Sequence, residues 1–184
     1  MTKKIVIMNG MGKSGKDTFA SFVSQYIPTY KYSIIDLPKK AATLLGWDGG
    51  KTEKDRKFLS DIMDLSTEYN DSPWRDVVSV VTDFLTDKNT AKVLIVDMRD
   101  PKDIKRAKET FGATTVLIRN PNAKTIVGNH ADVEVENYKY DYIIENDGTL
   151  GQLETMAKIF VRDILLDNEF PVSDEPFMLT CSKY

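Results

Sequence analysis

The first candidate for a chemical role is a glycine-rich stretch, Asn9-Gly10-Met11-Gly12-Lys13-Ser14-Gly15-Lys16-Asp17-Thr18. It follows an apolar run at 5–8 that is typical of a buried strand, and apolar residues at helical spacing follow it. The glycines allow backbone angles that turn successive N–H groups into one concavity. The start of a helix adds unpaired N–H donors, and Lys16 can place a cation on the β- and γ-phosphates. We therefore predict a nucleotide site formed by Gly10, Gly12, Lys13, Ser14, Gly15, Lys16, Asp17 and Thr18.

The residue after Lys16 departs from the general phosphate-loop pattern. Asp17 stands where Ser or Thr usually contacts Mg²⁺, and Thr18 follows it. Two interpretations are open. Asp17 can simply favour the first turn of a helix, where a carboxylate contributes about 0.3–1 kcal/mol. Alternatively, Thr18 supplies the hydroxyl to Mg²⁺ and Asp17 helps to hold the water shell of the metal.

Polar side chains also follow the other apolar runs of the chain. Asp36, Asp97, Arg119 and Asn146 each come at the end of a predicted strand. Because ligands bind beyond the carboxyl ends of parallel strands, we expect these side chains to lie near the glycine-rich loop. Asp97 stands where a carboxylate can hold Mg²⁺ beside a phosphate loop, although a helix-capping role is the alternative. Arg99 carries a planar guanidinium suited to a second phosphate, or to a surface salt bridge.

Length and composition exclude several classes of protein. The 184 residues suit one domain that buries most of its apolar surface. The net charge of −3 gives no basic footprint for nucleic acid, and no apolar run approaches the length of a membrane span. The first residues lead into a strand rather than a signal peptide, and Cys181 has no second cysteine to pair with. We expect a cytoplasmic enzyme without nucleic-acid or membrane partners, while the oligomeric state stays open.

Short apolar strands alternate with helical segments along the chain. Strands are expected at 5–8, 31–35, 92–96, 114–118 and 140–145, and helices at about 17–26, 37–45, 53–69, 72–85, 101–110 and 149–165. This alternation predicts an α/β three-layer sandwich, with a five-stranded parallel sheet covered by helices on both faces. The tail at about 168–184 contains two prolines and no clear element.

Several motifs together resemble the deoxynucleoside monophosphate kinases, a branch of the P-loop NTPases. Gly15-Lys16-Asp17-Thr18 is similar to their phosphate loop, and Asp97-Met98-Arg99-Asp100-Pro101 is similar to their segment after the third strand. Asp36-Leu37-Pro38-Lys39 resembles the stretch that leads into their monophosphate-binding helices. Segments 46–48, 54–59 and 70–74 recur in the same order, so the resemblance covers roughly the first 165 residues.

The resemblance implies an enzyme that transfers the γ-phosphoryl group of ATP, with Mg²⁺, to a nucleoside monophosphate. It implies one kinase domain over 1–184, with a helical acceptor-binding insertion at about 37–88 and a lid-like loop at about 120–138 that contains His130 and Glu134. Catalytic roles fall on Lys16, Asp97 and Arg119, and metal binding on Asp17, Thr18 and Asp97. Arg119, Asn146 and Gly148 join the nucleotide-binding set, although Asn146 and Gly148 can equally form a plain turn and helix cap. The implied acceptor-binding residues are Asp36, Lys39, Arg56, Trp74 and Arg99.

Two other readings of the same motifs remain open. Kinases of the phosphomevalonate or dephospho-coenzyme A type share the loop-and-lid plan and differ in the acceptor. A regulatory ATPase would bind the nucleotide without any acceptor. The long insertion between Asp36 and Trp74 argues against this last class, because a simple nucleotide switch needs no second pocket.

Overall fold

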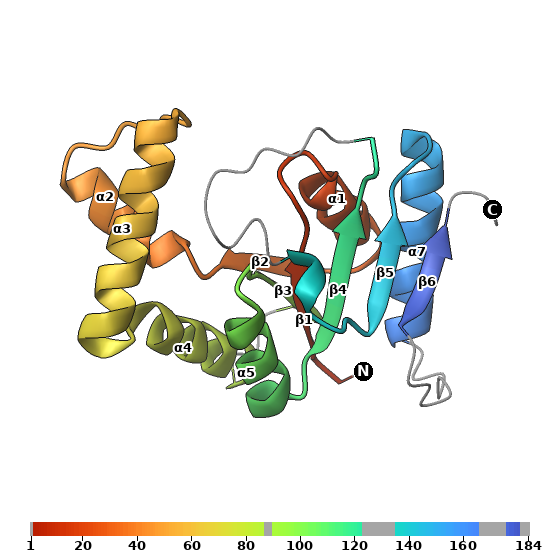
Figure 1. The fold of residues 1–184 in the computed structure, drawn as a ribbon. Coiled ribbons are helices and arrows are strands. Elements are labelled where there is room, and N and C mark those ends of the chain that lie inside the picture. The colour runs from red at the N-terminus through yellow and green to blue at the C-terminus, as the bar shows by residue number, and fades with distance from the viewer. Residues whose placement is uncertain (1, 87–89, 123–134, 166–175, 181–184) are drawn as a thin grey trace.

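The computed structural model describes residues 2–86, 90–122, 135–165 and 176–180. Strands and helices alternate along the chain, as the apolar pattern predicts (Figure 1). The elements in order are β1 (Lys4–Asn9), α1 (Lys16–Tyr26), β2 (Thr29–Ser33), α2 (Asp36–Leu44), α3 (Glu53–Asn70), α4 (Ser72–Thr86), β3 (Val93–Asp97), α5 (Pro101–Phe111), β4 (Thr114–Arg119), η1 (Val135–Asn137), β5 (Tyr142–Glu145), α7 (Leu150–Leu165) and β6 (Phe177–Thr180).

The sheet has six strands in the order β2-β3-β1-β4-β5-β6, and every neighbouring pair is parallel. The predicted number of five was wrong because β6 was not foreseen. This strand is only four residues long, and Phe177 and Met178 are exposed, so it is a short edge strand rather than a buried one. It forms because β5 offers a free edge. The Phe177 N–H donates to the carbonyl of Asp141 over 2.8 Å, and Leu179 enters the core.

Helices cover both faces of the sheet, which gives three layers. In β1, Val6 and Met8 point into one apolar cluster with α1 and α7, whereas Ile5 and Ile7 point into another with α4 and α5. Successive strand side chains alternate between faces, so a parallel sheet covered on both sides needs apolar residues at every position. That requirement explains the unbroken apolar runs of β1 and β3.

The second strand ends earlier than its sequence indicates. A strand was expected at 31–35, but β2 covers Thr29–Ser33 and α2 begins at Asp36. The Asp36 carboxylate accepts a hydrogen bond from the Ser33 N–H over 2.9 Å. This side-chain acceptor replaces the sheet partner and turns the chain into the helix, which is a common use of aspartate.

Two helices, α2 and α3, form what we call the helical arm (residues 36–70). They stand at the far side of the molecule from α7 and β6 (Figure 1). No residue of α3 is fully buried, and Leu44, Leu65 and Tyr69 expose most of their surface. A capping box formed by Thr52 and Asp55 begins α3. Within the arm, α2 buries Pro38 and Ala42, whereas α3 packs on α2 and α4 without burying a residue fully.

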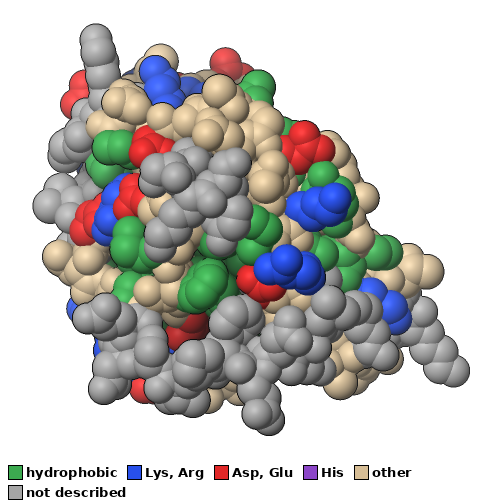
Figure 2. All heavy atoms as spheres, turned by 90° about the vertical axis from the view of Figure 1, so that its right-hand side faces the viewer, with side chains coloured by type: hydrophobic (Ala, Val, Ile, Leu, Met, Phe, Trp, Pro, Cys, Tyr) green, Lys and Arg blue, Asp and Glu red, His purple; other side chains and the backbone are tan. Residues whose placement is uncertain are grey.

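The opposite face of the molecule carries α7 and β6. Basic and acidic side chains are interspersed on the part of it that is described, with apolar side chains between them (Figure 2). Across the described ranges, no helix has the combination of length and apolar character that a membrane span requires.

Candidate phosphate-transfer site

The glycine-rich loop joins β1 to α1, and its conformation explains two of its glycines. A Cβ at Gly10 would lie 2.6 Å from Ser14 Oγ and 2.7 Å from the Ile118 carbonyl oxygen, closer than real contacts allow. Gly15 has a φ of +92° and caps α1, where an L side chain is strained. Lys13 also has a positive φ, of 68°. Gly12, in contrast, has open space around it. The loop thus curls tightly beneath the start of α1.

Ser14 supports the interpretation of this loop as an anion site. Its N–H donates to the Met11 carbonyl over 3.1 Å, which closes the turn. Its Oγ is buried and has no hydrogen-bond partner in the described structure. A buried hydroxyl without a partner costs about 1–3 kcal/mol, so such groups usually have a ligand or water to bind. A phosphate oxygen in the curl of the loop would supply that partner.

Two asparagines hold the loop in place. The Asn9 Oδ1 accepts from the Gly10 N–H over 2.7 Å, and its Nδ2 donates to the Tyr140 hydroxyl over 2.7 Å and to the Arg99 carbonyl over 3.2 Å. From the other side, Asn146 Nδ2 donates to the Ser14 carbonyl over 2.8 Å. The sequence analysis gives Asn146 a place in the site, whereas Asn9 opens the glycine-rich stretch there without a role of its own. The available signal was a polar residue at the buried end of an apolar strand.

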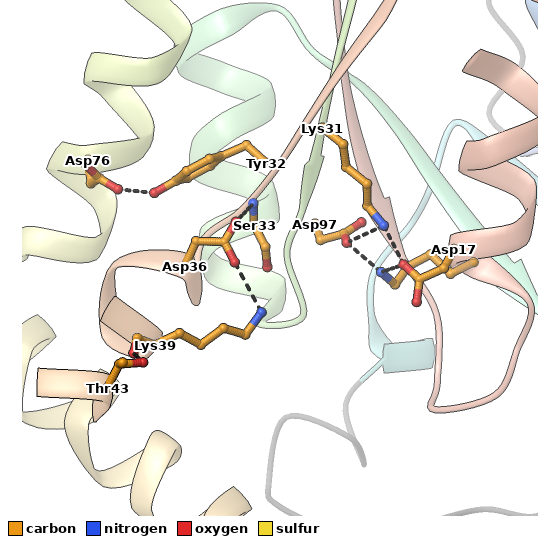
Figure 3. A network of polar contacts seen from close by, with 10 residues as sticks. Asp17, Lys31, Tyr32, Ser33, Asp36, Lys39, Thr43, Asp76 and Asp97 are labelled. Carbon is orange, nitrogen blue, oxygen red and sulfur yellow. Dashed lines mark hydrogen bonds and ion pairs between the residues drawn. The ribbon is translucent and has the colours of Figure 1, made fainter. Parts of the chain in front are cut away.

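Lys16 and Asp97 meet directly. Lys16 is the first residue of α1, Asp97 is the last of β3, and Lys16 Nζ lies 2.6 Å from Asp97 Oδ2. Lys31 reaches the same oxygen from β2, over 3.3 Å, and also pairs with Asp17 Oδ1 (Figure 3). Lys16 Nζ is 3.6 Å from that Asp17 oxygen. The cluster therefore joins two lysines and two aspartates from three elements, α1, β2 and β3.

The charges of this cluster stabilise one another. The hydrogen bond from Lys31, with a further contribution from Lys16, lowers the pKa of Asp17 below its usual range. Burial opposes the charge on Lys31, yet the ion pairs with Asp17 and Asp97 outweigh it and raise the pKa of that lysine. Side-chain exposure is 16% for Lys16 and 15% for Asp97, against 81% for Asp17. The pair of Lys16 and Asp97 is thus the shielded centre, and Asp17 forms its solvent-facing rim.

The aspartates fit a magnesium ion shared with a nucleotide. No group of three or more histidine, cysteine or acidic residues that could hold a metal occurs among the described residues. Mg²⁺ does not need one, since it commonly uses one or two carboxylates, several waters and substrate phosphates. Asp97 Oδ1 is buried and has no hydrogen-bond partner among the described residues, so it is available to a metal or to a water bound to the metal. Thr18 lies half-buried in the same helical turn as Asp17.

Arg119 ends β4 and forms two ion pairs. Its guanidinium contacts Glu136, and its Nη1 lies 2.7 Å from Glu145 Oε1. The hydrogen bond to Glu136 and then that to Glu145 raise the pKa of Arg119, against the effect of burial. To reach a phosphate, Arg119 would have to exchange these carboxylates for it.

Gly148 lies exposed in the turn before α7. The predicted lid-like loop falls mostly outside the described residues, and so do His130 and Glu134.

The predicted acceptor-binding residues are not all in one place. Asp36 and Lys39 pair over 3.1 Å at the carboxyl end of β2, beside Lys31 and Asp97 (Figure 3). Arg99 follows β3, and its carbonyl is bound to Asn9 below the loop. These three residues lie at the edge of the sheet that carries the glycine-rich loop.

Arg56 and Trp74 lie elsewhere. Arg56 is in the second turn of α3, where its Nε donates to the Lys51 carbonyl over 3.3 Å. Trp74 is buried under α5, with Phe111 stacked on its ring at 5.4 Å and the Arg106 guanidinium 4.1 Å from the ring centroid. A pocket of about 370 Å³ does open within the helical arm, next to Arg56, and is lined by Leu45, Gly46, Trp47, Asp48, Lys54, Asp55 and Phe58.

Comparison with known proteins gives the fold. No protein-family model and no curated protein sequence matches the chain. Among solved structures it is similar to TT1252 from Thermus thermophilus, with 14% identity, a TM-score of 0.52, and 89% of this chain and 99% of that chain covered. A shikimate kinase from Aquifex aeolicus matches with 14% identity, a TM-score of 0.47 and coverage of 89% and 99%. A thymidylate kinase from Ehrlichia chaffeensis matches with 14% identity, a TM-score of 0.35 and coverage of 98% and 93%. At this identity the similarity to TT1252 shows a shared α/β fold, and the activity has to be argued from the site.

Proposed function

We propose that this protein transfers the γ-phosphoryl group of MgATP to a small phosphorylated acceptor, in the first instance a nucleoside monophosphate. The observation that supports this most is the meeting of Lys16 and Asp97 beside a glycine loop with an unpartnered buried hydroxyl, Ser14. A cation for phosphates, a carboxylate for a metal and a curled backbone are the parts that phosphoryl transfer requires.

The donor side would work by positioning and charge. Residues Gly10 to Thr18 wrap the triphosphate, and Ser14 gains its missing partner. Lys16 would exchange its ion pair with Asp97 for the β- and γ-phosphate oxygens, and Asp97 would hold the metal together with Asp17 and Thr18. The Mg²⁺ would neutralise phosphate charge and orient the γ-phosphoryl group. No covalent intermediate is needed, because the transferred group passes in line between two oxygens.

The acceptor side would lie between the loop and the helical arm. Asp36, Lys39 and Arg99 stand at this edge of the sheet, and the guanidinium of Arg99 can bind a phosphate in a bidentate manner. Arg56 would have to approach with α3 as a whole. The nucleoside monophosphate is our choice because segments 36–39 and 97–101 resemble those of kinases with that acceptor.

The test combines a panel of acceptors with one substitution. We expect ADP release from ATP to depend on an added nucleoside monophosphate, assayed beside mevalonate phosphate and dephospho-coenzyme A. Lys16→Ala should lower the rate by about 10²–10³, the usual cost of losing one group that stabilises transferring charge. Lys158→Ala, an exposed lysine of α7, is the matched control and should keep the parent rate.

Each outcome of this assay has a clear meaning. Turnover with one of the other two phosphates would keep the kinase and change its acceptor. ATP hydrolysis that no acceptor accelerates would replace the kinase by a regulatory ATPase. A well-folded Lys16→Ala protein that retains the parent rate would end the proposal that the loop binds phosphate.

A further inference from the structure

Lys31 belongs to none of the motifs that predict the site, yet its side chain reaches the centre of it. It lies in β2, the edge strand of the sheet, and its ammonium is shared between Asp17 and Asp97 (Figure 3). Its side chain is 38% exposed, so both contacts are at the mouth of the site rather than inside the core. A lysine at this position of β2 is not needed for the sheet, whose ladder uses backbone groups.

The contacts of Lys31 fall on the oxygens that a metal would need. Asp17 Oδ1 and Asp97 Oδ2 each form ion pairs with both Lys31 and Lys16, so the two lysines balance the two carboxylates. A divalent cation that approaches the nucleotide-free protein meets a neutral cluster. It also has to displace an ammonium from each oxygen that those lysines occupy. Among the carboxylate oxygens of the described residues, only Asp97 Oδ1 is buried without a hydrogen-bond partner.

The two lysines differ in the partners that a bound nucleotide would offer them. Lys16 lies at the end of the loop and has phosphate oxygens to go to when ATP binds. Lys31 comes from another strand and gains nothing from the loop itself. We propose that Lys31 is an internal counter-cation, which competes with a divalent metal for Asp17 and Asp97 and so keeps the site metal-poor until nucleotide arrives. This inference rests on the proposed function, because the metal site is part of it.

The order of binding follows from simple charge balance. A triphosphate brings several negative charges into the cluster, and these favour a divalent cation in addition to the ammonium groups. Without the triphosphate, the energy of removing Lys31 from two carboxylates has to come from the metal alone. The result is a protein that binds metal and nucleotide together, and that binds free metal weakly.

The test measures Mn²⁺ binding without nucleotide, from the electron paramagnetic resonance signal of free Mn²⁺. We expect Lys31→Gln to bind Mn²⁺ roughly tenfold more tightly than the parent, because a net negative charge replaces a neutral cluster. The matched control is Lys108→Gln, since the Lys108 side chain is 40% exposed and pairs with Asp141 away from the loop. That variant should keep the parent affinity. If the glutamine variant does not fold, Lys31→Thr serves instead, because threonine suits an edge strand.

A second arm repeats the titration with a non-hydrolysable ATP analogue. With the analogue bound, the Mn²⁺ affinities of Lys31→Gln and the parent should differ by about twofold or less, because the phosphates then supply the negative charge. Unchanged or weaker Mn²⁺ binding by nucleotide-free Lys31→Gln would overturn the inference. Loss of affinity for the analogue, with Mn²⁺ affinity unchanged, would overturn it too and make Lys31 a phosphate ligand.

Calorimetry of ATP binding to the parent separates this inference from the proposed function. If the parent binds MgATP while the Mn²⁺ affinities of parent and Lys31→Gln are equal, only the role of Lys31 fails. If the parent binds no ATP, the proposed function fails, and the titrations without nucleotide still report whether Lys31 competes with metal.

Discussion

The glycine-rich loop and the helical arm contribute to the same proposed reaction, but they are built in opposite ways. The loop lies between β1 and α1, whose inner residues are completely buried, and asparagines hold it from two sides. The arm has a long helix, α3, without one fully buried residue. A rigid loop suits phosphate binding, which depends on preorganised donors. A lightly packed arm suits an acceptor site that has to open and close, because such segments come from the least stable part of a structure.

Core truncation should separate the two regions most. Phe19 of α1 is fully buried against Phe160, with ring centroids 5.6 Å apart, whereas Leu65 of α3 is 66% exposed. We expect Phe19→Ala to lower the free energy of unfolding by about 3–5 kcal/mol and Leu65→Ala by less than about 0.5 kcal/mol. Urea denaturation of both variants measures the difference. A cost for Leu65→Ala near that of Phe19→Ala would mean that another surface covers the arm.

The loop itself offers a finer comparison between two glycines. Gly10→Ala should destabilise the protein by about 1–3 kcal/mol, because its new methyl group has to displace a backbone carbonyl. Gly12→Ala has open space and should change stability by no more than about 0.5 kcal/mol. Thermal unfolding of the two variants, followed by circular dichroism, provides the test. Equal melting temperatures would show that the loop can move to accommodate a methyl group at residue 10. The loop would then not be more rigid than the helical arm.

The contact between α5 and the end of α3 in the helical arm should respond to pH. Arg106 of α5 pairs with Asp71, at the end of α3, over 2.6 Å. Nearby, burial and the charges of Asp100 and Asp71 raise the pKa of Asp103 to about 6. A carboxyl whose pKa is raised by folding contributes stability below its unfolded pKa, and this contribution disappears as the pH rises through the folded value.

Asp103→Asn removes that dependence. We expect the variant and the parent to be similarly stable near pH 4, and the variant to be more stable by on the order of 1 kcal/mol above pH 7. Urea denaturation between pH 4 and 8 measures this difference. A parent that gains stability relative to the variant as the pH rises would contradict the raised pKa of Asp103.

The features of the protein that depend on local physics could be predicted from the amino-acid sequence. The glycine-rich loop, the apolar runs of β1 and β3 and the alternation of strands with helices were all predictable, because turn chemistry and hydrophobic periodicity act over a few residues. The expectation that Lys16 and Asp97 share a site required one further rule, that parallel strands end at a common edge. It did not require the coordinates.

Which side chains meet at that edge of the sheet depends on how the elements pack in three dimensions. Lys31 reads as an ordinary polar residue of a strand, and its place in the charge cluster arises because β2 pairs with β3 and passes beside α1. Trp74 is one of the acceptor-binding residues that the resemblance implies, and the packing of α4 on α5 buries it. β6 exists because β5 has an open edge. Each of these depends on contacts between residues far apart in the sequence, and no local pattern encodes which distant partner will be present.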